Sequence, residues 1–140
     1  MNRSIFSLFV FIPALACAGE HAVSVPASGA PQVVASFATV DVQDLKRLGD
    51  EAEVFILDVR TAGEFAAGHM PGALNIDVAV LERSLDQLEA YRDQPVYVSC
   101  RTSNRSRVAS QVLVDAGFSN VTQVLGGFSD WQASGFEVAR

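Results

Sequence analysis

The segment "SCRTSNRSR", residues 99–107, holds the residue types in this sequence that are best suited to chemistry. It places the thiol of Cys100 beside the guanidinium groups of Arg101 and Arg105. Positive charge favours the thiolate over the thiol, and the thiolate is the nucleophilic form of cysteine. The same charges attract an oxyanion such as a sulfonate or a phosphate. The segment therefore predicts a nucleophilic cysteine, exposed to solvent, that acts on an anionic substrate.

A strand is predicted before this segment and a helix after it. The residues "PVYV" before it are mostly β-branched or aromatic, which favours a strand. Residues 107–117 after it have apolar side chains at helical spacing. These apolar positions are Val108, Val112, Leu113 and Ala116. The start of a helix presents unpaired backbone N–H groups and the positive end of the helix dipole, and both favour an anionic sulfur on Cys100.

The rest of the chain alternates between predicted strands and predicted helices. Strands are predicted at residues 37–40, 54–59, 73–77, 95–99 and 120–125. Helices are predicted at residues 42–48, 61–68, 80–92, 107–117 and 126–135. This alternation predicts an α/β fold with a central parallel sheet and helices on both faces. Sites in such sheets form beyond the carboxyl ends of the strands, where Cys100, Asp58 and Arg60 are expected.

The first 18 residues have the features of a secretory signal peptide. Arg3 precedes an apolar run at residues 5–16, and a small-residue cleavage motif ends at Ala18. The following residues are rich in Ala, Ser, Gly and Pro, which predicts a flexible linker. The expected organisation is a signal peptide at 1–18, a linker at 19–36 and a domain at 37–140. We therefore expect export to the periplasm.

Two alternatives remain open for this N-terminal segment. "ALAC" resembles a bacterial lipobox, which would attach a lipid at Cys17 and hold the chain at a membrane. Without cleavage, the apolar run would instead stay as an anchor. If the signal peptide is removed, Cys100 has no cysteine partner in the chain. A lone cysteine in an exported protein is either buried and inert or kept for its reactivity.

Composition bounds the partners of the chain. It has 140 residues and a formal net charge of −6 at pH 7, which argues against a nucleic-acid partner. Its two histidines and Cys100 are widely spread and lack the spacing of metal ligands. No metal site is predicted.

Three separated motifs carry a resemblance to a known family. "CRTSNRS" is similar to an active-site loop of the form C-x-x-G-x-R-S. "LDVRTAGEFAAGHMPGALNI", residues 57–76, is similar to D-V-R-x-x-x-E-F-x-x-G-H-x-P-G-A-x-N-I. "GFSNVTQVLGGFSDW", residues 117–131, is similar to an ending around a Gly-Gly pair and a Trp. These are the motifs of the single-domain rhodaneses. They span about residues 36–138 in the family's order, so the chain resembles an exported bacterial rhodanese.

The resemblance implies a sulfurtransferase that needs no metal or organic cofactor. The thiolate of Cys100 would take the outer sulfur of a donor such as thiosulfate and so become a persulfide. A thiophilic acceptor, cyanide in assays, would then remove that sulfur from Cys100. Arg101 would meet the sulfonate of the donor, and Arg105 is the family's loop arginine. Backbone N–H groups from Arg101 to Arg105, including those of Thr102, Ser103 and Asn104, would bind the persulfide. The family commonly has Gly where this chain has Ser103, so a slightly different loop curve is expected.

The resemblance also implies supporting roles around the site. Asp58 and Arg60 are expected to form a structural ion pair that holds the loop. Glu64 is expected to be the partner of an arginine. His69 is placed in a turn away from the nucleophile and is not expected to be a catalytic base. Trp131 is expected to pack in the core.

Two other functions remain open. A phosphatase or arsenate reductase loop has the form C-x5-R, which would require an arginine where this chain has Ser106. A non-turnover module would hold sulfur on Cys100, and pass it to a protein acceptor, or would simply bind an anion. Turnover compared with a single round of persulfide loading separates this carrier from an enzyme.

Overall fold

Five parallel strands form one sheet in the computed structural model, which describes residues 36–140. The strands are β1 (Ala38–Val40), β2 (Phe55–Asp58), β3 (Leu74–Asn75), β4 (Val96–Ser99) and β5 (Val121–Val124). Their order across the sheet is β1-β5-β4-β2-β3, and every neighbouring pair is parallel. The predicted parallel α/β fold is confirmed. β4 lies at the centre of the sheet, so its carboxyl end is flanked by the ends of β5 and β2.

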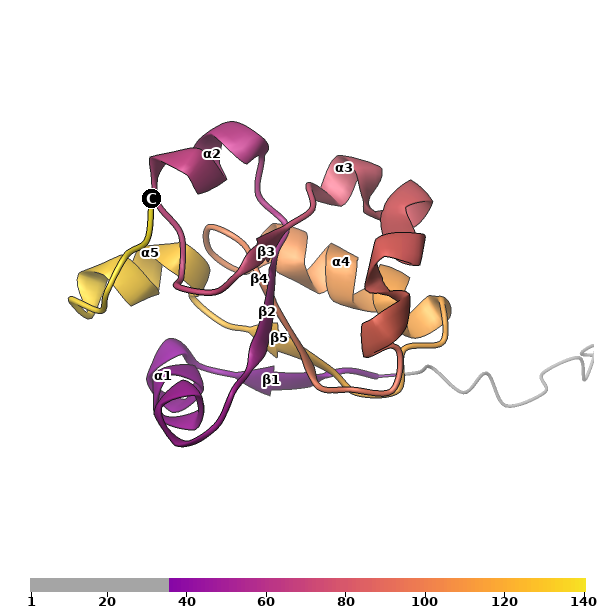
Figure 1. Cartoon of the computed structure of the whole chain (residues 1–140), viewed down its shortest axis with the longest axis horizontal. Coiled ribbons are helices and arrows are strands. Elements are labelled where there is room, and N and C mark those ends of the chain that lie inside the picture. The colour runs from indigo at the N-terminus through magenta and orange to yellow at the C-terminus, as the bar shows by residue number, and fades with distance from the viewer. Residues whose placement is uncertain (1–35) are drawn as a thin grey trace, which may run out of the picture. The chain divides into compact units, whose positions relative to one another are not determined.

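Helices cover both faces of the sheet, as the sequence predicted (Figure 1). One face carries α1 (Val42–Glu51) and α5 (Gly127–Ala133). The other face carries α3 (Val78–Leu81), the 3-10 helix η1 (Glu82–Tyr91) and α4 (Asn104–Asp115). The short helix α2 (Ala62–Ala67) connects β2 to the segment before β3. The loop that follows β4 therefore lies between α4 on one side and α5 on the other.

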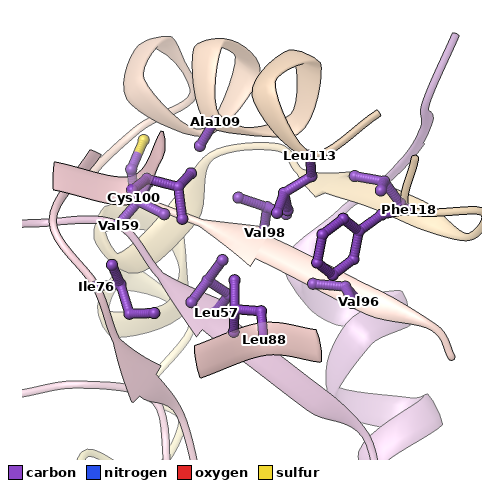
Figure 2. Packing of buried hydrophobic residues seen from close by; sticks show 12 residues of the cluster. Leu57, Val59, Ile76, Leu88, Val96, Val98, Cys100, Ala109, Leu113 and Phe118 are labelled. Carbon is purple, nitrogen blue, oxygen red and sulfur yellow. The ribbon is translucent and has the colours of Figure 1, made fainter. Parts of the chain in front are cut away.

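The apolar strands are buried on both sides because each sheet face has its own core. Leu57 of β2 packs with the cluster under α3, η1 and α4, which Figure 2 shows. Its neighbour Ile56 packs with the opposite cluster under α1 and α5. Successive side chains of a strand point to opposite faces. A continuous apolar run is therefore what a strand covered on both faces requires.

Three predicted helices differ from the observed ones. The helix predicted at 42–48 continues through Gly49 to Glu51. The segment predicted as one helix at 80–92 is a short α-helix, α3, followed by the 3-10 helix η1. The helix predicted from residue 107 begins three residues earlier, at Asn104. Its buried face consists of Ser106, Ala109, Ser110 and Leu113. Val108, predicted to be on the apolar side, is 50% exposed, because the buried positions follow the spacing i, i+3, i+4 and i+7 from residue 106.

The predicted signal peptide at 1–18, including Cys17, lies outside the described residues. The predicted linker at 19–36 also lies outside them except for its last residue. Within residues 36–140, no helix is long and apolar enough to cross a membrane.

Candidate active site

Cys100 follows β4 directly, at the carboxyl edge of the sheet. Ser99, the last residue of β4, pairs in register with Asp58, the last residue of β2. The structure therefore brings Cys100, Asp58 and Arg60 to the same edge, as predicted. Two adjacent parallel strands ending at the same level explain how residues far apart in the sequence share one site.

The prediction that Cys100 is exposed is wrong. Only 1% of the residue is accessible, and it belongs to the core cluster beneath α4 (Figure 2). Its strand is central, and α4 packs over the end of that strand. Its Sγ lies 3.5 Å from the hydroxyl oxygen of Ser106, which is also fully buried. The thiol is therefore shielded from bulk solvent by the loop and α4.

The loop carbonyls are held by the start of α5. The carbonyl of Cys100 accepts a hydrogen bond from the N–H of Phe128 at 2.8 Å, and that of Arg101 accepts from Ser129 at 2.9 Å. In a trans peptide the N–H points opposite to the C=O. The N–H groups of Arg101 and Thr102 therefore point away from α5. This orientation provides donors for an anion on the side of the loop opposite α5.

Gly127 is required by the close approach between α5 and this loop. Its φ is +56°, and an added Cβ would lie 2.4 Å from the carbonyl oxygen of Cys100. The sequence contained the Gly-Gly pair as part of a motif, but only the structure gives the physical reason for Gly127. A side chain there would displace the loop that holds the cysteine.

Ser103 fits the position where the family commonly has glycine. Its φ is −154°, outside the left-handed region, so a serine side chain causes no backbone strain. Its hydroxyl accepts a hydrogen bond from the N–H of Gly126 at 3.0 Å, and its carbonyl accepts from Nε2 of Gln123 at 2.7 Å. Because this hydroxyl is used elsewhere, the start of α4 has no side-chain cap. The first amides of α4 therefore remain available to an anion.

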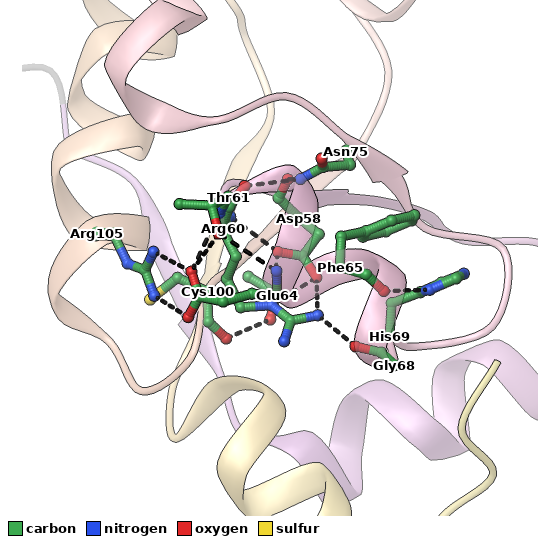
Figure 3. A network of polar contacts seen from close by, with 11 residues as sticks. Asp58, Arg60, Thr61, Glu64, Phe65, Gly68, His69, Asn75, Cys100 and Arg105 are labelled. Carbon is green, nitrogen blue, oxygen red and sulfur yellow. Dashed lines mark hydrogen bonds and ion pairs between the residues drawn. The ribbon is translucent and has the colours of Figure 1, made fainter. Parts of the chain in front are cut away.

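Arg105 and Glu64 form a two-bond ion pair (Figure 3). The two terminal nitrogens of Arg105 donate to the carboxylate oxygens of Glu64 at 2.7 and 2.8 Å. Glu64 is placed by a capping box with Thr61 at the start of α2. The hydrogen bonds from Arg105 lower the pKa of Glu64 from 4.5 to about 2, and Glu64 in turn raises the pKa of Arg105. The expectation that Glu64 is the partner of an arginine is confirmed.

Asp58 and Arg60 form the expected structural ion pair, and both side chains are almost completely buried. Nη2 of Arg60 donates to Oδ2 of Asp58 at 2.7 Å and to the carbonyl of Gly68 at 2.8 Å (Figure 3). The guanidinium carbon of Arg60 lies 4.1 Å from the ring centre of Phe128. Because Phe128 also donates its N–H to Cys100, the ion pair supports the helix that holds the loop.

The remaining predicted residues separate into two groups. Arg101, Thr102 and Asn104 are exposed around the loop, where a substrate could reach them. His69 stacks on Phe65 and lies well away from Cys100, as expected, but it forms an antiparallel bridge with Ala139 rather than a turn (Figure 3).

Trp131 is 5% exposed and packs in the core, also as expected. Among residues 36–140, no group of three or more His, Cys, Asp or Glu side chains could hold a metal ion.

Three supporting residues were missed by the sequence analysis. Ser106 contacts the sulfur, and Gln123 reaches the loop from β5. Asn75 donates to the carbonyls of Asp58 and Arg60 at 2.9 and 2.8 Å. Asn75 had a signal, because it occupies the Asn of the second motif. Gln123 had none, because a polar residue in a strand is usually read as solvent-facing.

Comparisons with known proteins agree with this arrangement. The model of the rhodanese-like domain family matches residues 41–134. The chain is 30% identical over 99 residues to thiosulfate sulfurtransferase GlpE of Pseudoalteromonas translucida, covering 71% of this chain and 92% of that protein. It is 36% identical over 98 residues to adenylyltransferase and sulfurtransferase UBA4 of Meyerozyma guilliermondii. That match covers 66% of this chain but only 23% of the much longer relative.

Solved structures give the same fold. The human single-domain sulfurtransferase TSTD1 superposes with a TM-score of 0.63 at 26% identity, covering 70% of this chain and 97% of that one. RPA3614 of Rhodopseudomonas palustris, described as a possible tyrosine phosphatase, superposes with a TM-score of 0.66 at 25% identity, covering 74% and 85%. With the family model matched from the first helix to the last, the chain belongs to the rhodanese-like domain family.

Proposed function

We propose that the chain is a thiosulfate sulfurtransferase that works through a persulfide on Cys100. The observation that carries the proposal is the loop after β4, whose carbonyls at Cys100 and Arg101 are tied to α5. This leaves the opposite N–H groups and the uncapped start of α4 as donors around one sulfur. Such an arrangement of donors suits a persulfide on Cys100, because the outer sulfur of a persulfide carries the negative charge.

The reaction divides into two sulfur transfers. The thiolate of Cys100 bonds to the outer sulfur of thiosulfate, the S–S bond of the donor breaks, and its electron pair leaves with sulfite. A thiophilic acceptor such as cyanide then bonds to the outer sulfur of the persulfide. The persulfide S–S bond breaks, and its electron pair returns to Cys100 as a thiolate. Splitting the transfer in this way is covalent catalysis, and no metal or organic cofactor is required.

The neighbouring side chains have distinct roles in this proposal. The exposed guanidinium of Arg101 receives the sulfonate of the donor, and the backbone N–H groups from Arg101 to Arg105 bind the outer sulfur. Arg105, held by Glu64 at 2.7 and 2.8 Å, fixes the first turn of α4 against α2. Burial of Cys100 protects the persulfide from water between the two steps.

A phosphatase activity is less well supported. The C-x5-R form needs a guanidinium at the position of Ser106, whose buried hydroxyl instead contacts the sulfur. The nearest loop arginine, Arg105, has both terminal nitrogens on Glu64. A carrier function uses the same persulfide and differs only in the acceptor, which would be a protein rather than a small molecule.

Thiocyanate formation from thiosulfate and cyanide tests the proposal. The purified full chain should form thiocyanate over many turnovers, and Cys100→Ala should form none. Loading of one sulfur without turnover would indicate a carrier. Hydrolysis of p-nitrophenyl phosphate by the full chain, without sulfur transfer, would support the phosphatase alternative.

We also propose export with cleavage after Ala18, on the basis of Arg3 and the apolar run that follows it. The N-terminal sequence of the protein recovered from the periplasm should begin at Gly19. A lipid-modified Cys17 at the N-terminus would instead establish a lipoprotein.

A further inference from the structure

A buried chain of polar groups connects the sulfur of Cys100 to β5. Sγ of Cys100 lies 3.5 Å from Oγ of Ser106, which lies 3.1 Å from the carbonyl oxygen of Ser103. The side-chain amide of Gln123 reaches both, with Nε2 2.7 Å from that carbonyl and 3.3 Å from that hydroxyl. Cys100, Ser106 and Gln123 are 1%, 0% and 4% exposed. Each group therefore depends on its protein partners rather than on bulk water.

The number of protons in this chain limits what each group can do. A serine hydroxyl has one proton to donate and lone pairs that accept. When Cys100 is a thiol, its S–H can donate to Ser106, whose own proton goes to the carbonyl of Ser103. When Cys100 is a thiolate, the hydroxyl must turn its proton to the sulfur, since two facing acceptors repel. The carbonyl of Ser103 also accepts the N–H of Arg107 at 3.1 Å. A carbonyl oxygen has two lone pairs, and the second would lose its donor unless Gln123 fills it.

We propose that Gln123 is a positioning residue for sulfur transfer. It donates to the second lone pair of the Ser103 carbonyl, beside the N–H of Arg107, and so leaves the hydroxyl of Ser106 to donate to the anionic sulfur of Cys100. Its second contact, to Oγ of Ser106, is compatible with both orientations of the hydroxyl, because Gln123 donates and Oγ accepts. The inference rests on the proposed function and adds to it the device that stabilises the thiolate.

The hydrogen bond acts twice in each cycle. Negative charge is on Sγ of Cys100 before it bonds to the outer sulfur of the donor. Between the steps, the charge is on the outer sulfur of the persulfide. It returns to Sγ when the acceptor bonds to the outer sulfur and the persulfide S–S bond breaks. Ser106 therefore stabilises Sγ as the attacking group in the first step and as the leaving group in the second.

Three variants test this role. Gln123→Met keeps the length of the side chain and removes its donors, and Ser106→Ala removes the hydroxyl. Gln94→Met is the matched control, because the Gln94 amide also donates to a backbone carbonyl, that of Ala90 at 3.2 Å, but precedes β4 at the opposite edge of the sheet. The readout is the rate at which thiosulfate adds one sulfur to the full chain, followed by mass spectrometry.

Gln123→Met and Ser106→Ala should each load sulfur about tenfold more slowly, the loss expected for one hydrogen bond to a charged group. The double variant should be no slower than Ser106→Ala, because Gln123 acts through Ser106. Loss of this hydrogen bond disfavours the thiolate of Cys100. The acidic limb of the pH dependence of the loading rate should therefore move up by about one pH unit in both single variants. A residue that only stabilises the fold would leave that limb in place. Gln94→Met should match the wild type in both the loading rate and the position of the acidic limb.

Wild-type loading by Gln123→Met, additive losses in the double variant, or an unmoved acidic limb would each overturn the inference. If Gln123→Met proves poorly folded by circular dichroism, Gln123→Leu is measured in its place with the same criteria. Failure of the wild type itself to gain sulfur would refute the proposed function. A wild type that loads normally beside unaffected variants refutes only the role of Gln123.

Discussion

Both terminal nitrogens of Arg105 donate to Glu64, which joins α4 to α2 beside Cys100. Two parallel bonds fix the direction of a guanidinium in a way that a single point charge cannot. The pair is partly solvated, with side chains 33% and 27% exposed. Its contribution to stability is therefore moderate, whereas its contribution to loop geometry is direct. These two contributions can be measured separately.

Arg105→Lys tests the geometric contribution. Lysine keeps the charge but loses the planar two-bond contact, so the first turn of α4 is held less firmly. We expect sulfur transfer to fall about tenfold, the loss of one charge-assisted hydrogen bond, with the fold retained. Steady-state thiocyanate formation measures the effect, and Arg107→Lys, an exposed position on the same helix, is the control. Equal rates for both variants would show that the two-bond contact has no role in transfer.

Glu64→Gln tests the contribution to stability. The folded pKa of Glu64 is about 2, below its ordinary value of 4.5. Its charge therefore stabilises the fold above about pH 4.5 and ceases to do so as the pH falls towards 2. After screening by solvent, we expect the Glu64 charge to contribute about 1–3 kcal/mol to the free energy of unfolding. The wild type should lose this contribution over that pH range, and Glu64→Gln should lack it at every pH. Urea unfolding at about pH 7 and about pH 3 measures it.

Glu82→Gln is the matched control for this acid titration. Glu82 is exposed at the start of η1, and no ion pair to it is found in residues 36–140. It should lose as much stability on acidification as the wild type does. Equal losses in the wild type and in Glu64→Gln would contradict the assignment.

At the scale of elements, α5 determines the shape of the active-site loop. Its first N–H groups donate hydrogen bonds to the carbonyls of Cys100 and Arg101. The aromatic ring of Phe128, also in α5, stacks on the guanidinium of Arg60. The loop is thus fixed by a helix that comes after it in the chain and lies on the other face of the sheet from α4. Disturbing α5 should therefore alter transfer without touching the nucleophile.

Gly127→Ala tests this contact. The added Cβ would lie 2.4 Å from the carbonyl oxygen of Cys100, so α5 and the loop must separate. We expect sulfur transfer to fall at least tenfold and the melting temperature to drop. Gly135→Ala is the control, because its φ is also positive, at +71°, yet nothing lies within 4 Å of its Cβ. That variant should lose only about 1 kcal/mol of stability from backbone strain and keep its transfer rate. Equal effects of the two substitutions would contradict the role of the contact.

Asp58→Asn tests the support beneath β2 and α5. It would leave Arg60, which is 1% exposed, as a buried cation without its carboxylate. Breaking such a pair costs about 3–5 kcal/mol. Urea denaturation should show a loss of that size, whereas Asp44→Asn, in an exposed pair with Arg47, should change stability by less than about 0.5 kcal/mol. A small loss for Asp58→Asn would mean that the ion pair is not a structural support.

At the scale of the whole molecule, the sequence was sufficient for the architecture. Parallel strands buried on both faces produce long apolar runs in the sequence, such as "VFILDV". The helices between them instead show apolar residues at a spacing of three or four. All five strands were therefore predicted correctly in kind. The 3-10 helix η1 was not, because Leu81, Leu85 and Leu88 follow the spacing i, i+4 and i+7, which indicates an α-helix rather than a 3-10 helix with three residues per turn.

The site was predictable where it lies in contiguous motifs and not where it depends on distant contacts. Cys100, Asp58 and Arg60 come at the ends of recognisable strands, so their meeting followed from the topology. The burial of Cys100 did not, because polar neighbours in the sequence conceal that α4 packs over the strand end. Gln123 was missed for the same reason, since only the pairing of β5 beside β4 brings it to the loop.

Addition of sulfur to Cys100 is the most direct measurement of the central claim. Thiosulfate should raise the mass of the full chain by one sulfur atom, peptide mapping should place that atom on Cys100, and cyanide should remove it as thiocyanate. Cys100→Ser should remain folded and gain nothing, because a serine hydroxyl stays protonated near neutral pH and cannot carry a persulfide. Sulfur transfer by Cys100→Ser at the wild-type rate, or a wild type that never gains sulfur, would contradict the account.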